Sequence, residues 1–467
     1  MFDKIRDWIV RGLDKMFSKS TIEEALKVPV AISKEMDNAM ELWLKIYTNN
    51  SPWLNKDVKS LELASSIAGE FARLTTLEMK TEITGSKRSD YLQEQYKKAL
   101  KDLKSNLELG NAVGGMIFKP YVKNKDICID IISQTYFKPL KFDNAGNIIS
   151  AVFTSQIQKG KTIYTRLETH TLNNNVYTVE NKVYKNDNYI SSMLGKLVSL
   201  TDVEEWSDLS ESVTIKGIEK PLFAYYKVPI ANNIDTKCSL GISVFNRAIN
   251  TIEDTETMNA RLDYEYDSAE RKLYVDSTAI KVDKDGKQVG KLPRIIQKID
   301  LTNKENNFYE EFSPGIRDEA FLRGINKKLQ QIEFQVGLAY GTISDPNNVD
   351  KTATEIKTSK QRSYSTVSQM QNNLQETLEH LVYILNVYTD LYELASSGEY
   401  ETSFEWDDSI IVDSEYEQKI RQNEVNQKLR SKKSYLMWRY GLKEKQAEEM
   451  LKEVKSETEE TEMFKEE

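Results

Sequence analysis

Histidine and cysteine are scarce in this chain, and their scarcity limits its chemistry. The 467 residues include only two histidines, His170 and His380, and two cysteines, Cys128 and Cys238. The cysteines stand far apart without ligand-like spacing, so reduced thiols in a cytosolic compartment are expected. With only two histidines, catalysis that depends on histidine is not expected. For His380 a packing or surface role is expected. No apolar run approaches the roughly 20 residues that span a bilayer, so no membrane partner is expected.

The sequence motifs of nucleotide hydrolysis, calcium binding and hydrolase catalysis are also missing. The glycines of 110–115 lack the Lys-Ser/Thr pair of a phosphate-binding loop. Asp283-Lys-Asp-Gly286 resembles the start of a calcium loop, but Arg294 stands where the closing carboxylate is required. No carboxylate pairs with a histidine or a glycine elbow in a hydrolase pattern. We therefore expect no enzymatic activity, no cofactor and no metal.

Composition indicates a folded protein of more than one subdomain. Hydrophobic residues make up 39% and charged residues 29% of the chain, which is ordinary for a soluble globular protein. Its length exceeds what one small core accommodates. The net charge of -9 argues against bulk electrostatic coating of nucleic acid. It remains compatible with a protein past which DNA slides without sticking.

Hydrophobic periodicity predicts an α+β fold. Met1–Leu13 is amphipathic, and a packing helix is favoured over a helix lying on a membrane surface. Residues 20–109 are predicted to be helical, with a turn at Asn49-Asn-Ser-Pro52. From 116 to 228 the period changes to two, which predicts an antiparallel meander. Its many aromatic side chains are expected to pack across strands rather than to stack on bases.

Three long helices are predicted in the centre of the chain, over 239–270, 315–340 and 352–397. Each carries one narrow apolar seam, which suits packing against neighbouring helices rather than burial on all sides. On the first two helices the expected packing residues are Ile249, Ile252, Ile325, Leu329, Ile332 and Val336.

A basic, β-rich excursion over 271–314 separates the first two of these helices. Its candidate surface comprises Arg271, Lys272, Lys281, Lys284, Lys287, Lys291 and Arg294. Two interpretations remain open: a solvated hairpin, or a basic surface that meets DNA or an acidic partner.

A polar loop over 341–351 separates the second and third helices. Its candidate functional residues are Asp345, Pro346, Asn347, Asn348, Val349, Asp350 and Lys351. After the third helix a strand is predicted over 401–406, with a continuation at 408–412. Charged helices follow from Ser414, and the acidic tail after Glu457 is expected to fray.

The order of these parts resembles the portal proteins of tailed bacteriophages, of the type found in siphophages and prophages of Gram-positive bacteria. Three segments carry the resemblance over nearly the whole chain. They are Tyr47-Thr-Asn-Asn-Ser-Pro-Trp-Leu54, the segment Gly241–Asp254, and Gly337-Leu-Ala-Tyr-Gly-Thr-Ile-Ser344 followed by Lys351-Thr-Ala-Thr-Glu-Ile356.

The resemblance implies a ring of subunits, usually a dodecamer, around a DNA tunnel at one capsid vertex. It implies an α/β wing (1–238, with a strand from 398–412), a two-helix stem (239–270 and 315–340), a small β-containing clip (271–314), a tunnel loop (341–351), a long tunnel-bridging helix (352–397) and a helical crown (413–467). The implied partners are double-stranded DNA, held transiently, the terminase large subunit, the head–tail connector, and the major capsid and scaffolding proteins. The protein would be assembled in the host cytoplasm and reside in the virion.

Two other functions remain as alternatives. One is a cytosolic scaffold that oligomerises through coiled coils, which predicts assemblies of few strands rather than a ring. The other is a phage-encoded nuclease or protease, which the missing motifs disfavour.

Overall fold

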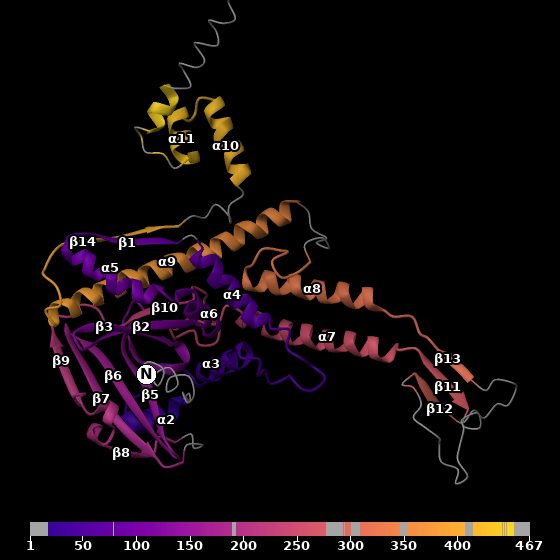
Figure 1. Cartoon of the computed structure of the whole chain (residues 1–467), viewed down its shortest axis with the longest axis horizontal. Helices are drawn as coiled ribbons and strands as arrows, with labels where there is room; N and C mark the ends of the chain where they lie inside the picture. The colour runs from indigo at the N-terminus through magenta and orange to yellow at the C-terminus, as the bar shows by residue number, and fades with distance from the viewer. Residues whose placement is uncertain are drawn as a thin grey trace, which may run out of the picture.

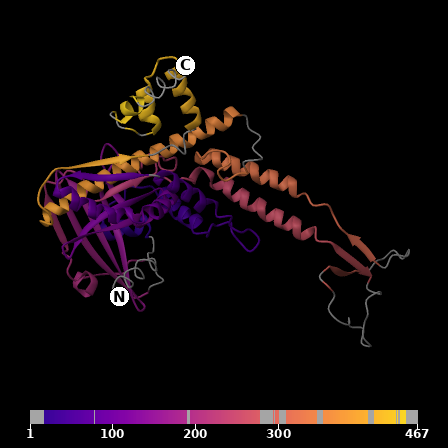
Figure 2. The same ribbon diagram turned by 45° about the horizontal axis from the view of Figure 1, so that its top comes forward.

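The computed structural model describes residues 17–77, 79–188, 193–276, 293, 295–299, 309–345, 353–406, 414–440, 442, 444 and 446–452. Helices and antiparallel sheets form one body, from which a pair of long helices projects as an arm (Figures 1 and 2). The predicted α+β class is confirmed. The predicted helix at 1–13, the strand continuation at 408–412 and the tail after Glu457 lie outside the described residues.

The first part of the body is helical, as predicted. Its helices are α2 (Lys19–Leu26), α3 (Lys34–Tyr47), α4 (Leu63–Thr76), α5 (Lys87–Leu100) and α6 (Leu103–Val113). Ser18, Ser33 and Ser86 precede α2, α3 and α5, and each serine side chain accepts a hydrogen bond from a backbone N–H of the first turn. Such caps satisfy donors that have no partner within the helix.

The helical prediction was wrong at one place in this region. Strand β1 (Lys80–Gly85) lies between α4 and α5 and pairs with β14 (Tyr400–Glu405) near the other end of the chain. Because β1 pairs with a strand so far along the chain, local hydrophobic periodicity does not predict it.

The predicted antiparallel region is confirmed. A three-stranded sheet has the order β10-β2-β3, and a larger sheet has the order β4-β5-β6-β7-β8, with β9 also paired to β7. The strands are β2 (Gly115–Lys123), β3 (Asp126–Ser133), β4 (Phe137–Phe142), β5 (Ile148–Lys159), β6 (Thr162–Asn173), β7 (Val176–Asn186), β8 (Lys196–Val198), β9 (Ser212–Lys216) and β10 (Ala224–Lys227).

Helix α9 (Ala353–Leu391) lies across the sheet formed by β10 and β2 and also packs on α4 and α5 (Figure 1). It ends at Leu391 rather than at 397. Its predicted apolar seam is fully buried in the core, which confirms the periodicity argument for this helix. The seam consists of Val367, Met370, Leu374, Leu378, Leu381 and Leu385.

His170 belongs to a buried polar network inside the larger sheet. Its Nδ1 lies 2.6 Å from the Tyr177 hydroxyl and its Nε2 lies 2.8 Å from Oε1 of Glu168. Burial opposes ionisation of Glu168, but Lys119 and Arg166 outweigh burial and hold the pKa of that carboxyl well below its usual range. Burial lowers the pKa of His170. The histidine is therefore neutral at pH 7, donates to Glu168 and accepts from Tyr177.

His380 is a packing residue of α9, as expected, and it makes the fold sensitive to acid. Its Nε2 donates to the carbonyl oxygen of Pro221 at 2.9 Å. Burial, assisted by Lys220, lowers the pKa of His380 to about 4 despite this hydrogen bond. The unfolded chain, with an ordinary histidine pKa of about 6.5, therefore binds a proton that the folded chain excludes.

We expect the free energy of unfolding to fall as the pH decreases from about 6.5 towards 4. A depressed folded-state pKa stabilises the protein above the unfolded-state value and ceases to do so as the pH falls. The contribution of His380 is no more than about 3 kcal/mol, and His170 acts in the same direction. Urea denaturation of His380→Gln at pH 7 and pH 4.5 should show a smaller loss of stability than the parent chain shows. An equal loss in both proteins would contradict this account.

The arm consists of α7 (Ile249–Ser268) and α8 (Asp318–Val336). The short strands β11 (Lys272–Asp276), β12 (Ile296–Ile299) and β13 (Tyr309–Phe312) lie at its far end (Figure 1). The first central helix was predicted to begin at 239, but α7 begins at Ile249. The preceding chain is not α-helical: residues 240–245 are buried, with Gly241 packed directly against the backbone of Gly114, and a 3₁₀ turn over Asn246–Ala248 leads into α7.

The C-terminal helices form a separate small cluster. Helix α10 (Ser414–Asn426) is followed by α11 (Lys432–Tyr440). The guanidinium carbon of Arg421 lies 4.2 Å from the ring centre of Trp438, which joins the two helices by a cation–π contact.

Candidate functional site

The two helices of the arm are held in one antiparallel register. Lys328 binds Asp254 at 2.8 Å, and Arg317 binds Glu265 at 2.7 Å farther along. Between these ion pairs Gly324 faces Met258, where a β-carbon would come within 2.4 Å of the methionine methyl group. The glycine lets the helices approach, and the flanking ion pairs fix their alignment.

The predicted stem-packing residues serve mainly to fasten the arm to its own body. Ile252, Ile332 and Val336 are buried in the core, and Ile249 and Leu329 pack against the same core. Ile325 lies farther out and is half-buried. These side chains therefore pack mainly within one chain rather than against another copy.

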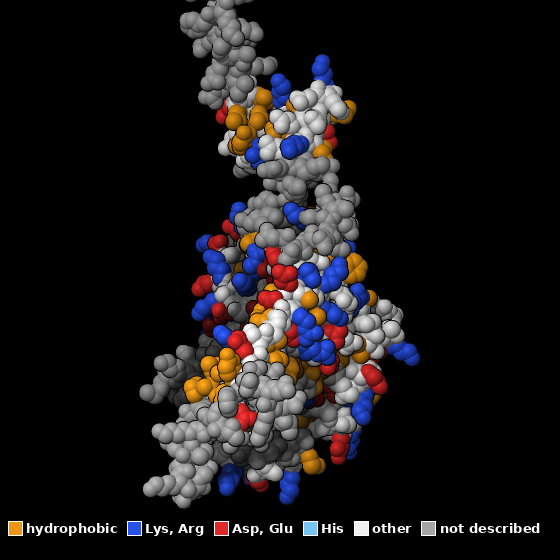
Figure 3. All heavy atoms as spheres, turned by 90° about the vertical axis from the view of Figure 1, so that its right-hand side faces the viewer, with side chains coloured by type: hydrophobic (Ala, Val, Ile, Leu, Met, Phe, Trp, Pro, Cys, Tyr) orange, Lys and Arg blue, Asp and Glu red, His pale blue; other side chains and the backbone are white. Residues whose placement is uncertain are grey.

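A different set of apolar side chains is exposed on the arm. Tyr264 is 73% exposed and Phe334 is 55% exposed. The set consists of Tyr264, Tyr266, Ile316, Leu322 and Phe334. Figure 3 views the molecule from the side of the arm and shows hydrophobic side chains exposed among charged ones. Leu322 belongs to the apolar seam predicted for the second helix, whereas the other four lie off the regular seams and periodicity does not identify them.

The exposed apolar residues do not share one face. Tyr264 and Tyr266 are two positions apart in α7, so their side chains are about 200° apart around the helix axis. One face of the arm alone therefore does not cover both rings. This geometry suits contacts on two sides of the arm.

The two helices also differ in the charge that they expose. On α7 the exposed carboxylates of Glu253, Asp263 and Asp267 outnumber the exposed Arg261, whereas α8 exposes Arg323 and Lys327 beside Glu319. Within the described part of the chain, the three α7 carboxylates and Lys327 have no ion-pair partner. The arm thus carries a more acidic and a more basic helix side by side.

A buried carboxylate fixes the base of the loop after α8. Glu333 is fully buried. Its Oε1 accepts hydrogen bonds from the backbone N–H of Ile343 at 2.8 Å and of Ser344 at 2.9 Å, and its Oε2 accepts from the Ser344 hydroxyl at 2.8 Å. The buried side chain of Glu333 therefore holds two consecutive loop residues against the arm.

Two further contacts complete this loop base, which we define as Tyr340–Asp345. The Asn326 side chain on α8 accepts from the backbone N–H of Asp345 at 2.8 Å. The Ser359 hydroxyl on α9 accepts from the backbone N–H of Tyr340 at 2.7 Å. Gly337 ends α8 in the left-handed conformation, with φ of 86°. The loop base is thus tied to both flanking helices.

The structure places only the first of the predicted loop residues. Asp345 is exposed, and its backbone is held as described above. The remaining candidates, Pro346, Asn347, Asn348, Val349, Asp350 and Lys351, lie outside the described residues. The prediction that a loop follows α8 is confirmed for 341–345.

Another buried glutamate joins the arm to the body. Glu256 on α7 accepts hydrogen bonds from Trp53 Nε1 at 2.6 Å, from the backbone N–H of Leu61 at 2.9 Å and from the Ser60 hydroxyl at 3.2 Å. Trp53 belongs to the segment 47–54 that the sequence analysis singled out. That segment therefore docks the body onto the first arm helix.

The predicted basic surface at the tip of the arm is only partly described. Arg271 is exposed and pairs with Glu311 at 2.7 Å, and Lys272 lies on β11. The other candidates, Lys281, Lys284, Lys287, Lys291 and Arg294, lie outside the described residues. The hairpin interpretation is wrong for the described strands, because β11 pairs with β12 in parallel and with the missed strand β13 antiparallel. Glu311 on β13 reduces the positive charge beside Arg271.

Within the described ranges, no group of three or more His, Cys, Asp or Glu side chains is placed to hold a metal ion. None of the described helices is long and apolar enough to cross a membrane. A comparison with known protein families finds no match to the chain, and a search of curated proteins finds no significant relative.

Proposed function

We propose that this chain is a bacteriophage portal subunit. Many copies would stand side by side through their arms and form a ring, usually a dodecamer, through which double-stranded DNA passes. The observation that carries the proposal is the arm: apolar side chains are exposed around it, and the exposed surface of α7 is more acidic than that of α8. One surface meeting a different surface on the next copy gives a heterologous contact, and such contacts close into rings.

The loop base supports the same function. It lies at the root of the arm, where a ring of copies would bring the loops together around the tunnel. Asp345, the one described residue among the tunnel-loop candidates, is an exposed aspartate. The chain as a whole carries a net charge of -9. Few cations at the tunnel wall suit DNA that must slide, because each phosphate contact strengthens binding and its dependence on salt.

The parts of the chain receive roles by the same proposal. The body (1–238 and 398–412) is the wing, the arm helices are the stem, and 271–314 is the clip that meets the terminase large subunit and later the head–tail connector. The loop at 341–351 lines the tunnel, α9 bridges wing and tunnel, and 413–467 is the crown. Capsid and scaffolding proteins would contact the outside, and the virion is the site of action.

The coiled-coil scaffold is the less favoured alternative. A coiled coil between copies requires a free apolar seam along a long helix. The seam of α9, which is the longest helix in the described residues, is buried against its own body. This burial supports the portal proposal over the scaffold.

Electron microscopy of the purified chain tests the proposal directly. We expect rings with a central hole, and we expect Tyr264→Asp with Leu322→Asp to remove them without changing the circular dichroism spectrum. Each buried aromatic contact contributes about tenfold to the affinity between copies, and the loss repeats at every interface of the ring. Tyr392→Asp, at an exposed apolar residue beyond α9, is the matched control and should leave rings intact. Two- or three-stranded particles, or unaffected rings in the arm variant, would contradict the proposal.

A further inference from the structure

The two-stranded sheet of β1 and β14 has one edge that α5 covers and one that no described strand covers. The strands pair antiparallel over Lys80–Gly85 and Tyr400–Glu405, and α5 packs beside β1 (Figures 1 and 2). On the edge of β1, the Gln93 side chain from α5 accepts from the backbone N–H of Ile83 at 2.8 Å. That N–H therefore points away from β14.

This one hydrogen bond fixes the direction of the backbone groups along β14. In an antiparallel ladder, paired residues alternate between those that bond to each other and those that both point outward. Ile83 is paired with Thr402, so Thr402 directs its N–H and C=O away from β1. By the same alternation, Tyr400 and Phe404 also direct their backbone groups outward.

No described strand or side chain takes up this outer edge of β14. Three residues thus present N–H and C=O groups in the spacing of an unfilled ladder. Such an edge is a template for one more strand, and strand addition is a recurrent way of binding an extended peptide.

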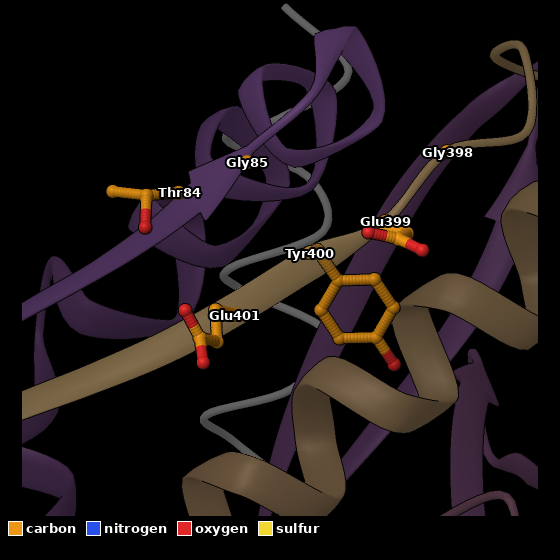
Figure 4. Close-up of a pocket in the computed structure, with 6 residues that line it drawn as sticks. All are labelled: Thr84, Gly85, Gly398, Glu399, Tyr400 and Glu401. Atoms are coloured by element: carbon orange, nitrogen blue, oxygen red, sulfur yellow. The ribbon is translucent and has the colours of Figure 1, made fainter.

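The side chains along this edge define the chemistry of the strand that fits. Tyr400 and Phe404 pack inward against the core, whereas Glu401, Ser403 and Glu405 are exposed on the other face. Glu399 and Glu401 also border a hollow at the start of β14, which Thr84, Gly85, Gly398 and Tyr400 complete (Figure 4). The carboxylates of Glu399, Glu401 and Glu405, interrupted only by Ser403, oppose another acidic chain and attract a basic one.

We propose that β14 binds an extended segment of a partner protein that carries lysine or arginine at every second position. The segment would pair with Tyr400, Thr402 and Phe404 through its backbone. Its basic side chains would lie beside Glu401 and Glu405. The arm and the loop take no part in this surface, so the inference goes beyond the proposed function and does not depend on it.

A fluorescent peptide of alternating lysine and threonine tests this inference. Fluorescence anisotropy with the full chain should show saturable binding, and a peptide of alternating glutamate and threonine should not bind. Thr402→Pro removes only an outward N–H, a change that an edge strand tolerates, and should weaken binding by about tenfold or more. Glu401→Lys with Glu405→Lys provides a second variant that keeps the backbone unchanged and should weaken binding similarly. Glu211→Lys, an exposed site directly before β9, is the matched control and should bind normally.

Hydrogen exchange locates the bound peptide. The amides of Thr402 and Phe404 should become protected on binding, whereas the Ser403 amide, which points towards β1, should already be slow. Absence of binding, or protection confined to other parts of the chain, would overturn the proposal. Self-association that Thr402→Pro abolishes would also overturn it, because the occupant would then be a second copy. Ring formation is measured separately and is unaffected by either result.

Discussion

Replacing Glu333 by alanine is expected to release the loop base and abolish DNA packaging, while subunits still assemble into rings. The change removes the acceptor of three hydrogen bonds, so two backbone N–H groups and the hydroxyl proton of Ser344 lose their acceptor. Each unmet buried donor costs about 1–3 kcal/mol. The amides of Ile343 and Ser344 should therefore exchange with solvent at least about a hundredfold faster, since 1.4 kcal/mol is a factor of ten.

The packaging part of this prediction rests on the proposed function, and the exchange part does not. Glu333→Gln keeps one carbonyl acceptor and should give an intermediate exchange rate. Glu319→Ala, at a highly exposed position of the same helix, should change neither exchange nor packaging in a reaction with terminase and ATP. Protected loop amides in Glu333→Ala would refute the structural account. Loss of the rings in that variant would refute the claim that the arm forms the ring while the loop acts in packaging.

The sequence predicts an element best where its hydrophobic side chains recur at a regular period and are the ones that the fold buries. The seam of α9 is regular and its residues are all buried, so Val367, Met370 and Leu374 were identified correctly. The alternating strands β5, β6 and β7 pair with their neighbours in the chain, and short hairpins are visible locally. Local signals and tertiary structure agree in these regions.

The same reasoning fails where a distant segment decides the structure. The segment before Ile249 looks α-helical, yet Gln134 donates to the backbone carbonyl of Gly241, and the α-helix begins only at Ile249. Strand β1 depends on β14. In both places the partner is far along the chain, and propensity alone is overridden by packing.

The sequence predicts the loop of the candidate site but not the two buried glutamates that hold it and the arm in place. The loop after α8 is signalled by Gly337, Gly341 and Pro346, which are ordinary helix-ending and turn residues. The roles of Glu256 and Glu333 have no such signal, because a glutamate on a helix is normally exposed to water. Only the donors that reach them from other segments make these two carboxylates part of the site.

Replacing Arg88 by methionine is expected to cause the largest loss of stability in the body. Arg88 is 1% exposed. Its guanidinium donates to Oδ1 and to the backbone carbonyl of Asn386, to Asp390 at 2.6 Å, and to the carbonyl of Ala395 at 3.0 Å. One side chain thus closes the C-terminal end of α9 and the turn that leads back to β14. Because Asp390 is 60% exposed and stays hydrated, the loss comes mainly from the other acceptors and should be about 1–3 kcal/mol for each one that is left without a partner.

Arg73→Met separates this network from an ordinary ion pair. Arg73 is exposed and binds only Glu70 on its own helix, so its loss should cost less than about 1 kcal/mol. Arg88→Lys should fall between the two, because an ammonium group has three donors and lacks the planar fork of arginine. Urea denaturation gives the ranking, and hydrogen exchange should show the loss concentrated in the end of α9 and in β14. Equal losses in Arg88→Met and Arg73→Met would show that the returning strand is held by β1 pairing alone, since the two variants differ chiefly in the contacts made to α9 and Ala395.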